Sequence, residues 1–253
     1  MYQYLELGGA RIPLYNLMIG IGILCGVLFL DYRIKKEAPP RETELHLYFA
    51  VILSIIAGFA GAKVFHAAYM GRGLTLRGFL SGGMTYYGGL ISGAAVFIAC
   101  AAAGGGNILH MVSMVTPSLV LAHVWGRVGC FLGGCCFGKP ARAIPGVVFP
   151  AGSIPYRHYG GSVAVYPVQL FESAFLSLLF LVMIKRTPPR LYVPVYMAWY
   201  GLFRFCAEFL RGDNRGTLWT GAPPPSGLIS IPLAAAGVVL YGALKKGCER
   251  ELK

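Results

Sequence analysis

The chain has 253 residues, of which 56% are hydrophobic and 13% are charged, with a mean hydropathy of +0.63. Because about a quarter of the residues of a soluble domain are charged, this composition excludes an ordinary soluble protein. It predicts an all-α integral membrane protein with residues 1–253 as a single polytopic domain. The net charge of +12 lies in clusters between apolar stretches, which favours contact with anionic membrane lipid and not with nucleic acid.

Seven apolar stretches, each near the about 20 residues that cross a bilayer, predict seven transmembrane helices. They cover residues 13–30, 47–69, 86–103, 108–125, 166–184, 192–210 and 226–244. Basic clusters follow the first, fifth and last stretches, near residues 33–41, 185–190 and 245–253. Since basic loops stay on the cytoplasmic side, we expect the N-terminus outside and the C-terminus inside.

Two pairs of glycines surround Tyr86 and Tyr87 in the segment 81–90, just before the third stretch. This pattern predicts a flexible or re-entrant hairpin that presents a phenol at the outer membrane surface. The alternative is that these side chains belong to the aromatic belt of the membrane interface. Tyr15, at the start of the first stretch, is either a residue of this aromatic belt or a contact to a lipid headgroup.

Arg127 directly follows an apolar run and is surrounded by glycines at 126, 129, 133, 134 and 138. A guanidinium can hold a phosphate with two hydrogen bonds, so this motif predicts an anionic ligand such as a phospholipid headgroup. The alternative is a tightly packed helix end from which Arg127 reaches the interface. The surrounding segment 126–165 is the longest outer loop and is expected to form a small folded outer cap.

The seven cysteines of the chain form no even disulfide framework. Cys130, Cys135 and Cys136 are clustered, but no nearby His or Cys pair completes a usual zinc pattern. Small packing residues are therefore expected here, with no metal and no cofactor. His123, near the outer end of its stretch, is interpreted as a hydrogen-bonded packing residue and not as a base.

Polar residues recur at helical spacing in the sixth stretch: Tyr200, Arg204, Glu208 and Arg211 are four, four and three residues apart. They are expected to share one helix face, which makes them a candidate functional site inside the protein. The alternative is a structural Arg204–Glu208 ion pair that fixes helix packing. Gln169 and Glu172 similarly share a face of the fifth stretch, either for a ligand or for hydrogen bonds to neighbouring helices.

Five separated motifs, taken in order, resemble those of the bacterial prolipoprotein diacylglyceryl transferases. They are Tyr15, Gly82–Leu90, Gly126–Phe131, Tyr166–Glu172 and Tyr200–Arg211. The resemblance implies a multi-pass enzyme of the bacterial inner membrane. Such an enzyme moves the diacylglyceryl group of phosphatidylglycerol to the lipobox cysteine of a prolipoprotein signal peptide, with formation of a thioether and release of glycerol phosphate.

The motifs together give Arg204, Arg127 and Tyr87 as candidate catalytic residues. The candidate substrate-binding residues are Tyr15, Tyr86, Gly88, Gly89, Cys130, Gly138, Gln169, Glu172, Tyr200, Glu208 and Arg211.

Two positions depart from the family pattern, which usually has histidine where this chain has Tyr87 and asparagine where it has Cys130. A tyrosine with a pKa of about 10 cannot easily take a proton from a thiol with a pKa of about 8.5. Either the base lies elsewhere, or neighbouring positive charge favours the thiolate, or the activity differs. We expect Tyr87 to contact lipid or substrate by a hydrogen bond. The alternative function is a non-enzymatic phospholipid-binding or lipid-translocating membrane protein.

Overall fold

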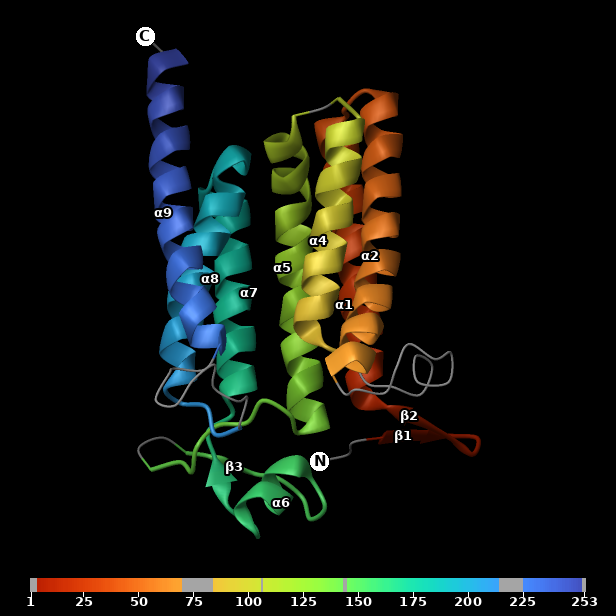
Figure 1. The fold of residues 1–253 in the computed structure, drawn as a ribbon, viewed down its shortest axis with the longest axis vertical. Helices are drawn as coiled ribbons and strands as arrows, with labels where there is room; N and C mark the ends of the chain where they lie inside the picture. Colours follow the sequence, from red (N-terminus) through yellow and green to blue (C-terminus); the bar gives the residue numbers. More distant parts are fainter. Residues whose placement is uncertain (1–3, 70–83, 106, 143–144, 214–224, 252–253) are drawn as a thin grey trace. The chain divides into compact units, whose positions relative to one another are not determined.

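The structure is a computed structural model that describes residues 4–69, 84–105, 107–142, 145–213 and 225–251. Each of the seven predicted stretches corresponds to one helix (Figure 1). The helices are α1 (Leu14–Glu37), α2 (Arg41–Tyr69), α4 (Tyr86–Ala103), α5 (Ile108–Gly133), α7 (Val168–Arg186), α8 (Tyr192–Glu208) and α9 (Pro225–Glu251). The expected all-α fold is confirmed.

Short elements connect these helices or precede them. The first two strands, β1 (Tyr4–Leu7) and β2 (Ala10–Pro13), form an antiparallel hairpin ahead of α1. A second antiparallel pair and two short helices lie between α5 and α8: β3 (Val147–Val148), α6 (Ile154–Tyr159), β4 (Ala164–Val165) and the 3-10 helix η1 (Pro189–Leu191).

The long helices have the length and surface that a bilayer requires. Five of them are long and apolar enough to cross a membrane, and Gly88–Ala103 of α4 is a shorter apolar helix. Large apolar side chains on their surfaces are exposed, as Leu178, Val238 and Val239 illustrate. In a soluble protein such a surface would be unusual, whereas in a bilayer it contacts lipid chains.

The chain divides into two compact units, one formed by Met1–Asp31 with Ser113–Lys253 and the other by Tyr32–Val112. In the second unit, α2 packs along α4 through glycines. A Cβ added to Gly88 would lie 2.7 Å from the Gly61 carbonyl oxygen, and one added to Gly89 would lie 3.0 Å from that of Gly58. Both glycines are thus required for close helix packing, where their small size lets two backbones approach.

The first unit is built around contacts of α5, α7 and α8, whose buried core includes Val120, Leu176, Met183 and Tyr200. On another face of α8, Gly201 lies against α9, where an added Cβ would be 2.8 Å from the Ser230 carbonyl oxygen. Residues between α5 and α7 have a small core of their own, formed by Phe137, Phe149 and Val165. Within this unit, β3 and α6 lie at the end opposite the C-terminus of α9 (Figure 1).

Two helix ends differ from the sequence expectation. The fourth stretch was expected to end at residue 125 and give way to the loop 126–165, but α5 continues to Gly133. Its glycines serve packing and not a turn, because a Cβ at Gly129 would lie 3.1 Å from the Met18 Cβ and 3.2 Å from the Tyr15 carbonyl oxygen of α1. The sixth helix ends at Glu208 and not at residue 210.

Candidate active site

The candidate site is centred on the fully buried carboxylate of Glu172, in the second turn of α7. Its Oε1 accepts a hydrogen bond of 2.8 Å from the Tyr200 hydroxyl of α8 and lies 3.0 Å from Nη2 of Arg127 in α5. The predicted alternative for Glu172, a polar link between neighbouring helices, is therefore what the structure shows. Since Arg127 and Glu172 are both buried, each compensates the charge of the other.

His123 extends this network from a position one helical turn before Arg127. Arg127 Nε donates a hydrogen bond of 3.2 Å to His123 Nε2, so that nitrogen carries no proton. The proton of the neutral ring is then on Nδ1, which donates to the Tyr196 hydroxyl at 3.2 Å. The Tyr196 and Tyr200 rings stack with centroids 5.3 Å apart. His123 is thus a hydrogen-bonded packing residue in the structure.

Arg204 is the second buried arginine of the site and lies one turn after Tyr200 on α8. Its Nη2 is 2.6 Å from Glu208 Oε2, which also accepts a hydrogen bond of 2.9 Å from Ser226 of α9. Nη2 is thus engaged by the Glu208 carboxylate. Among the described residues, Nη1 of Arg204 has no hydrogen-bond partner.

Arg211 does not share the helix face with Arg204, contrary to the sequence expectation. The chain leaves α8 after Glu208, and Lys139 then donates a backbone hydrogen bond of 2.8 Å to the Leu210 carbonyl. Arg211 instead holds Asp213 with two hydrogen bonds, of 2.9 Å from Nε and 2.7 Å from Nη2. Burial by itself lowers the pKa of Arg211, but the hydrogen bond and charge of Asp213 together with the interactions with Cys136 raise it above its ordinary value.

Several other candidate residues lie where α5 ends and α7 begins. The Gln169 Nε2 donates a hydrogen bond of 2.6 Å to the Cys135 carbonyl, and the Tyr15 side chain packs against Gly133. Gly138 forms a bridge with Arg211, and a Cβ added to Gly138 would lie 2.6 Å from the Tyr166 carbonyl oxygen. The structure therefore gives Gly138 a packing role in this segment.

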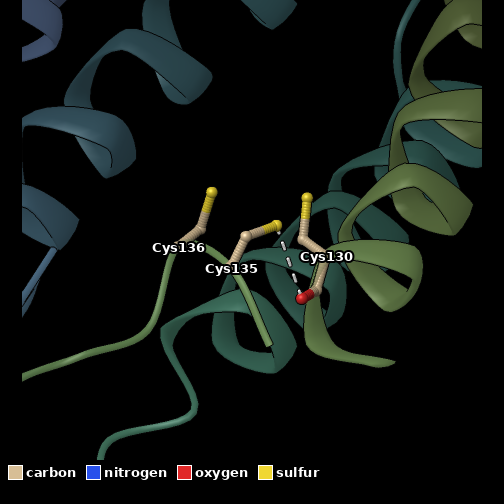
Figure 2. A group of neighbouring side chains, drawn as sticks. All are labelled: Cys130, Cys135 and Cys136. Carbon is tan, nitrogen blue, oxygen red and sulfur yellow. Dashed lines mark hydrogen bonds between the residues drawn. The ribbon is translucent and has the colours of Figure 1, made fainter. Parts of the chain in front are cut away.

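The three clustered cysteines also meet here, because their sulfur atoms lie within 4.8 Å of one another (Figure 2). Hydrogen bonds with the thiols of Cys130 and Cys136, together with burial, raise the pKa of Cys135 well above its ordinary value.

The remaining candidates, at the start of α4, belong to the other compact unit. Tyr86 and Tyr87 open that helix, but their side chains lie outside what the structure describes. Most of the expected hairpin before them, residues 70–83, also lies outside the described residues. Gly88 and Gly89 pack against α2 as described above.

The sequence did not place four residues in the site that contact it: His123, which was interpreted only as a packing residue, and Tyr196, Ser226 and Asp213. His123 could have been found from its four-residue spacing to Arg127, the same signal that pairs Arg204 with Glu208. Tyr196 likewise precedes Tyr200 by four residues. Ser226 and its contact with Glu208 depend on how α8 and α9 pack, which no local pattern encodes.

Apolar helices that enclose two arginine–carboxylate pairs define a multi-pass membrane protein with a buried polar site. Residues 3–243 match the family profile described as prolipoprotein diacylglyceryl transferase. The chain belongs to the prolipoprotein diacylglyceryl transferase family, which confirms the resemblance of its motifs.

Named relatives agree with this assignment over most of the chain. It is 33% identical over 250 residues to phosphatidylglycerol–prolipoprotein diacylglyceryl transferase 2 of Clostridium perfringens, an alignment that covers 95% of this chain and 94% of the relative. The transferase of Clostridium tetani is 35% identical over 222 residues, with coverage of 84% and 86%. That of Francisella tularensis subsp. novicida is 32% identical over 263 residues, with coverage of 97% and 95%.

Proposed function

We propose that the protein transfers the diacylglyceryl group of phosphatidylglycerol to the lipobox cysteine thiol of prolipoproteins. The family match and the names of its relatives support this reaction. The cysteine sulfur bonds to a glycerol carbon while the bond from that carbon to the phosphate oxygen breaks. The thiol gives up its proton and glycerol phosphate leaves.

The observation that carries the proposal is the state of Arg204. Its buried guanidinium is paired with Glu208 through Nη2, while Nη1 lacks a hydrogen-bond partner among the described residues. A lipid phosphate supplies the oxygen acceptors that such a fork can hold. As the carbon–oxygen bond breaks, negative charge grows on the phosphate, and a fixed cation in a site of low dielectric constant stabilises it. We assign this role to Arg204.

Arg127 has a different role in this proposal. Its Nη2 is paired with Glu172 and its Nε is hydrogen bonded to His123, so its charge is already compensated. We assign it the positioning of Tyr200, which donates to Glu172 one helical turn before Arg204. Tyr15, Gln169 and Arg211 are proposed to contact the substrates at the end of this site, with Tyr87 as a hydrogen-bonding contact.

The protein is proposed to lie in the bacterial inner membrane with its N-terminus outside. The basic residues at the ends of α7 and α9 support this orientation: Lys185 and Arg186 end α7, and Lys245 and Lys246 occur late in α9. The segment between α5 and α7 would then face outward, where secreted prolipoproteins are available. Cysteine labelling in residues 145–165 from outside intact cells tests this orientation, and labelling only after permeabilisation would contradict it.

The experiment that tests the function measures transfer from phosphatidylglycerol to a lipobox peptide by the purified chain in detergent. Wild type should convert the peptide, and Arg204→Ala should reduce the rate by about 100- to 1,000-fold. Arg33→Ala is a matched control, because Arg33 is also buried and also pairs with a glutamate four residues later, Glu37. This variant should keep transfer activity.

Growth of a strain depleted of its own transferase provides the same test in cells. Rescue by wild type and by Arg33→Ala, but not by Arg204→Ala, is expected. Lipid binding by the wild-type chain with no transfer in vitro and no rescue would contradict the enzyme and favour the non-enzymatic lipid-binding function.

A further inference from the structure

The three cysteines at the end of α5 have no role in the reaction proposed above, although Cys130 was a candidate substrate-binding residue. Cys130 lies in the last turns of the helix, which ends at Gly133, and Cys135 and Cys136 follow after Gly134. The three sulfur atoms all lie within 4.8 Å of one another, and each residue is half-buried. Figure 2 shows the three side chains extending toward the same side of the loop. This arrangement resembles a set of metal ligands more than a set of packing residues.

The end of α5 explains why thiols five and six residues apart meet. Gly134, with a φ of 70°, ends the helix in the left-handed conformation. Gly134 N donates to the Phe131 carbonyl at 3.1 Å, and Cys135 N donates to the Cys130 carbonyl at 3.1 Å. These two bonds form a Schellman motif, which brings the side chains at the Cys130 and Cys135 positions together. Cys136, with a φ of 61°, then turns back toward them.

The surroundings of the cluster suit a thiolate-bound cation. Three thiolates around a monovalent or divalent ion leave a net negative charge, and two buried arginines, each already paired with a carboxylate, add positive potential beside the cluster. Arg211 interacts with Cys136, and Arg127 interacts electrostatically with Cys130. Both arginine residues are buried, so their charges are only weakly screened.

Gln169, which contacts the cluster through the Cys135 carbonyl, provides a second observation. It is 1% exposed, and its Nε2 donates to the Cys135 carbonyl at 2.6 Å. Its other amide atom, Oε1, is buried without a hydrogen-bond partner among the described residues. A buried acceptor without a donor is unfavourable. A water molecule in the fourth position of a three-thiolate metal site could donate to it.

We propose that Cys130, Cys135 and Cys136 bind one thiophilic ion with a filled d shell, Zn²⁺ or Cu⁺. Thiolates are the preferred protein ligands of both ions. Three thiolates suit trigonal Cu⁺, and three thiolates with one water suit tetrahedral Zn²⁺. On binding, each thiol that becomes a ligand releases one proton. The bound ion would fix the end of α5 to the segment that pairs with Leu210 and Arg211.

Metal retention tests the proposal without reference to transferase activity, so its failure is distinguishable from failure of the proposed function. The full chain is purified under reducing, oxygen-free conditions, incubated separately with Zn²⁺ and with Cu⁺, and passed over a desalting column. Elemental analysis should find about one equivalent of one of these ions per chain. The ion that is retained against a competing chelator identifies the site's preference.

The variants Cys130→Ser, Cys135→Ser and Cys136→Ser should each lose this equivalent. We expect the affinity to fall by more than the roughly 100-fold that loss of an outer partner of a metal site can cost. The matched control is Cys25→Ser with Cys206→Ser, two cysteines outside the cluster. It should retain the ion. Absence of a retained ion in wild type, or full retention in all three cluster variants, would overturn the proposal.

A measurement on wild type alone covers the case in which the cluster variants fail to fold. Alkylation by N-ethylmaleimide, read by peptide mass spectrometry, should slow at least tenfold at the three cluster cysteines when the retained ion is present. The exposed Cys206 should react equally fast with and without the ion. Unchanged alkylation of the cluster, or a disulfide within it in the reduced preparation, would contradict the metal site.

Discussion

The two buried arginines of the site differ in how completely their surroundings satisfy them. Arg127 is engaged by side chains of three helices, through Glu172, His123 and Tyr200. Arg204 pairs with Glu208 on its own helix through Nη2, and its Nη1 lacks a hydrogen-bond partner among the described residues. A buried cation that several helices engage holds those helices together, whereas one with an unused donor can take a ligand. We therefore propose an architectural role for Arg127 and a ligand-binding role for Arg204.

The largest expected effect on stability comes from removal of the Glu172 carboxylate. Glu172→Ala should lower the free energy of unfolding by about 3–5 kcal/mol, because it leaves the charge of Arg127 buried without a partner. Unfolding in mixed micelles with increasing SDS measures the change. Glu6→Ala is the control and should cost about 1 kcal/mol or less, since Glu6 belongs to an exposed ion pair with Arg11, whose side chains are 67% and 75% exposed. If both variants lost the same free energy of unfolding, the Arg127–Glu172 pair would have no special architectural role.

The transferase activity of Arg127→Lys provides a second test of the difference between Arg127 and Arg204. Lysine keeps the positive charge but loses the planar fork that reaches both Glu172 and His123. We expect the transfer rate to fall about 100-fold because Tyr200 and the residues after it on α8 are no longer held in place. The measurement is the rate of diacylglyceryl transfer to the lipobox peptide. Wild-type activity would mean that only a positive charge is needed at this position.

A smaller effect on stability is expected from the contact between α8 and α9, next to the site. Gly201→Ala should lower the free energy of unfolding by about 1–3 kcal/mol, because the new Cβ would lie 2.8 Å from backbone atoms of Ser230 and Ala234. Gly20→Ala is the matched control, since a Cβ there meets no atom within 4 Å. The free energy of unfolding of the Gly20→Ala variant should not fall. An unchanged free energy of unfolding in Gly201→Ala would show that α8 and α9 can move apart without loss of stability.

Tyr87→Phe has the smallest expected effect. If the phenol only donates one hydrogen bond to lipid or substrate, its loss should slow transfer about tenfold, equivalent to about 1.4 kcal/mol. The measurement is transfer to the lipobox peptide at several pH values, beside Arg204→Ala. A Tyr87→Phe variant as inactive as Arg204→Ala would make the phenol essential and the contact-only role wrong.

Hydropathy predicted the helices well because lipid forces apolar residues into continuous helices. The third stretch, 86–103, has the same limits as α4. The end of α5 was missed because a glycine can serve either a turn or close helix packing, and only the neighbouring helix decides which. Gly129 faces the backbone of Tyr15 in α1, which the local sequence does not reveal.

The polar contacts likewise fall into two groups: those that the local sequence predicts and those that depend on how helices pack. Spacing within one helix was enough to predict the Arg204–Glu208 pair. The Arg127–Glu172 pair joins residues of two helices, so it depends on packing that periodicity does not encode. Arg211 was placed on the wrong surface because backbone pairing between Lys139 and Leu210 draws the chain away from α8. The three thiols meet through a Schellman turn and not through any familiar metal-binding spacing.

The central claim, that Arg204 holds the lipid phosphate, is tested most directly by binding. Phosphatidylglycerol and diacylglycerol with the same acyl chains differ in the phosphate headgroup, so their relative affinity isolates its contribution. Both are titrated into the protein in nanodiscs of neutral lipid. Wild type and Arg33→Ala should prefer phosphatidylglycerol by at least tenfold, which is about 1.4 kcal/mol, and Arg204→Ala should lose this preference. An unchanged preference in Arg204→Ala would contradict the assignment of the phosphate to Arg204.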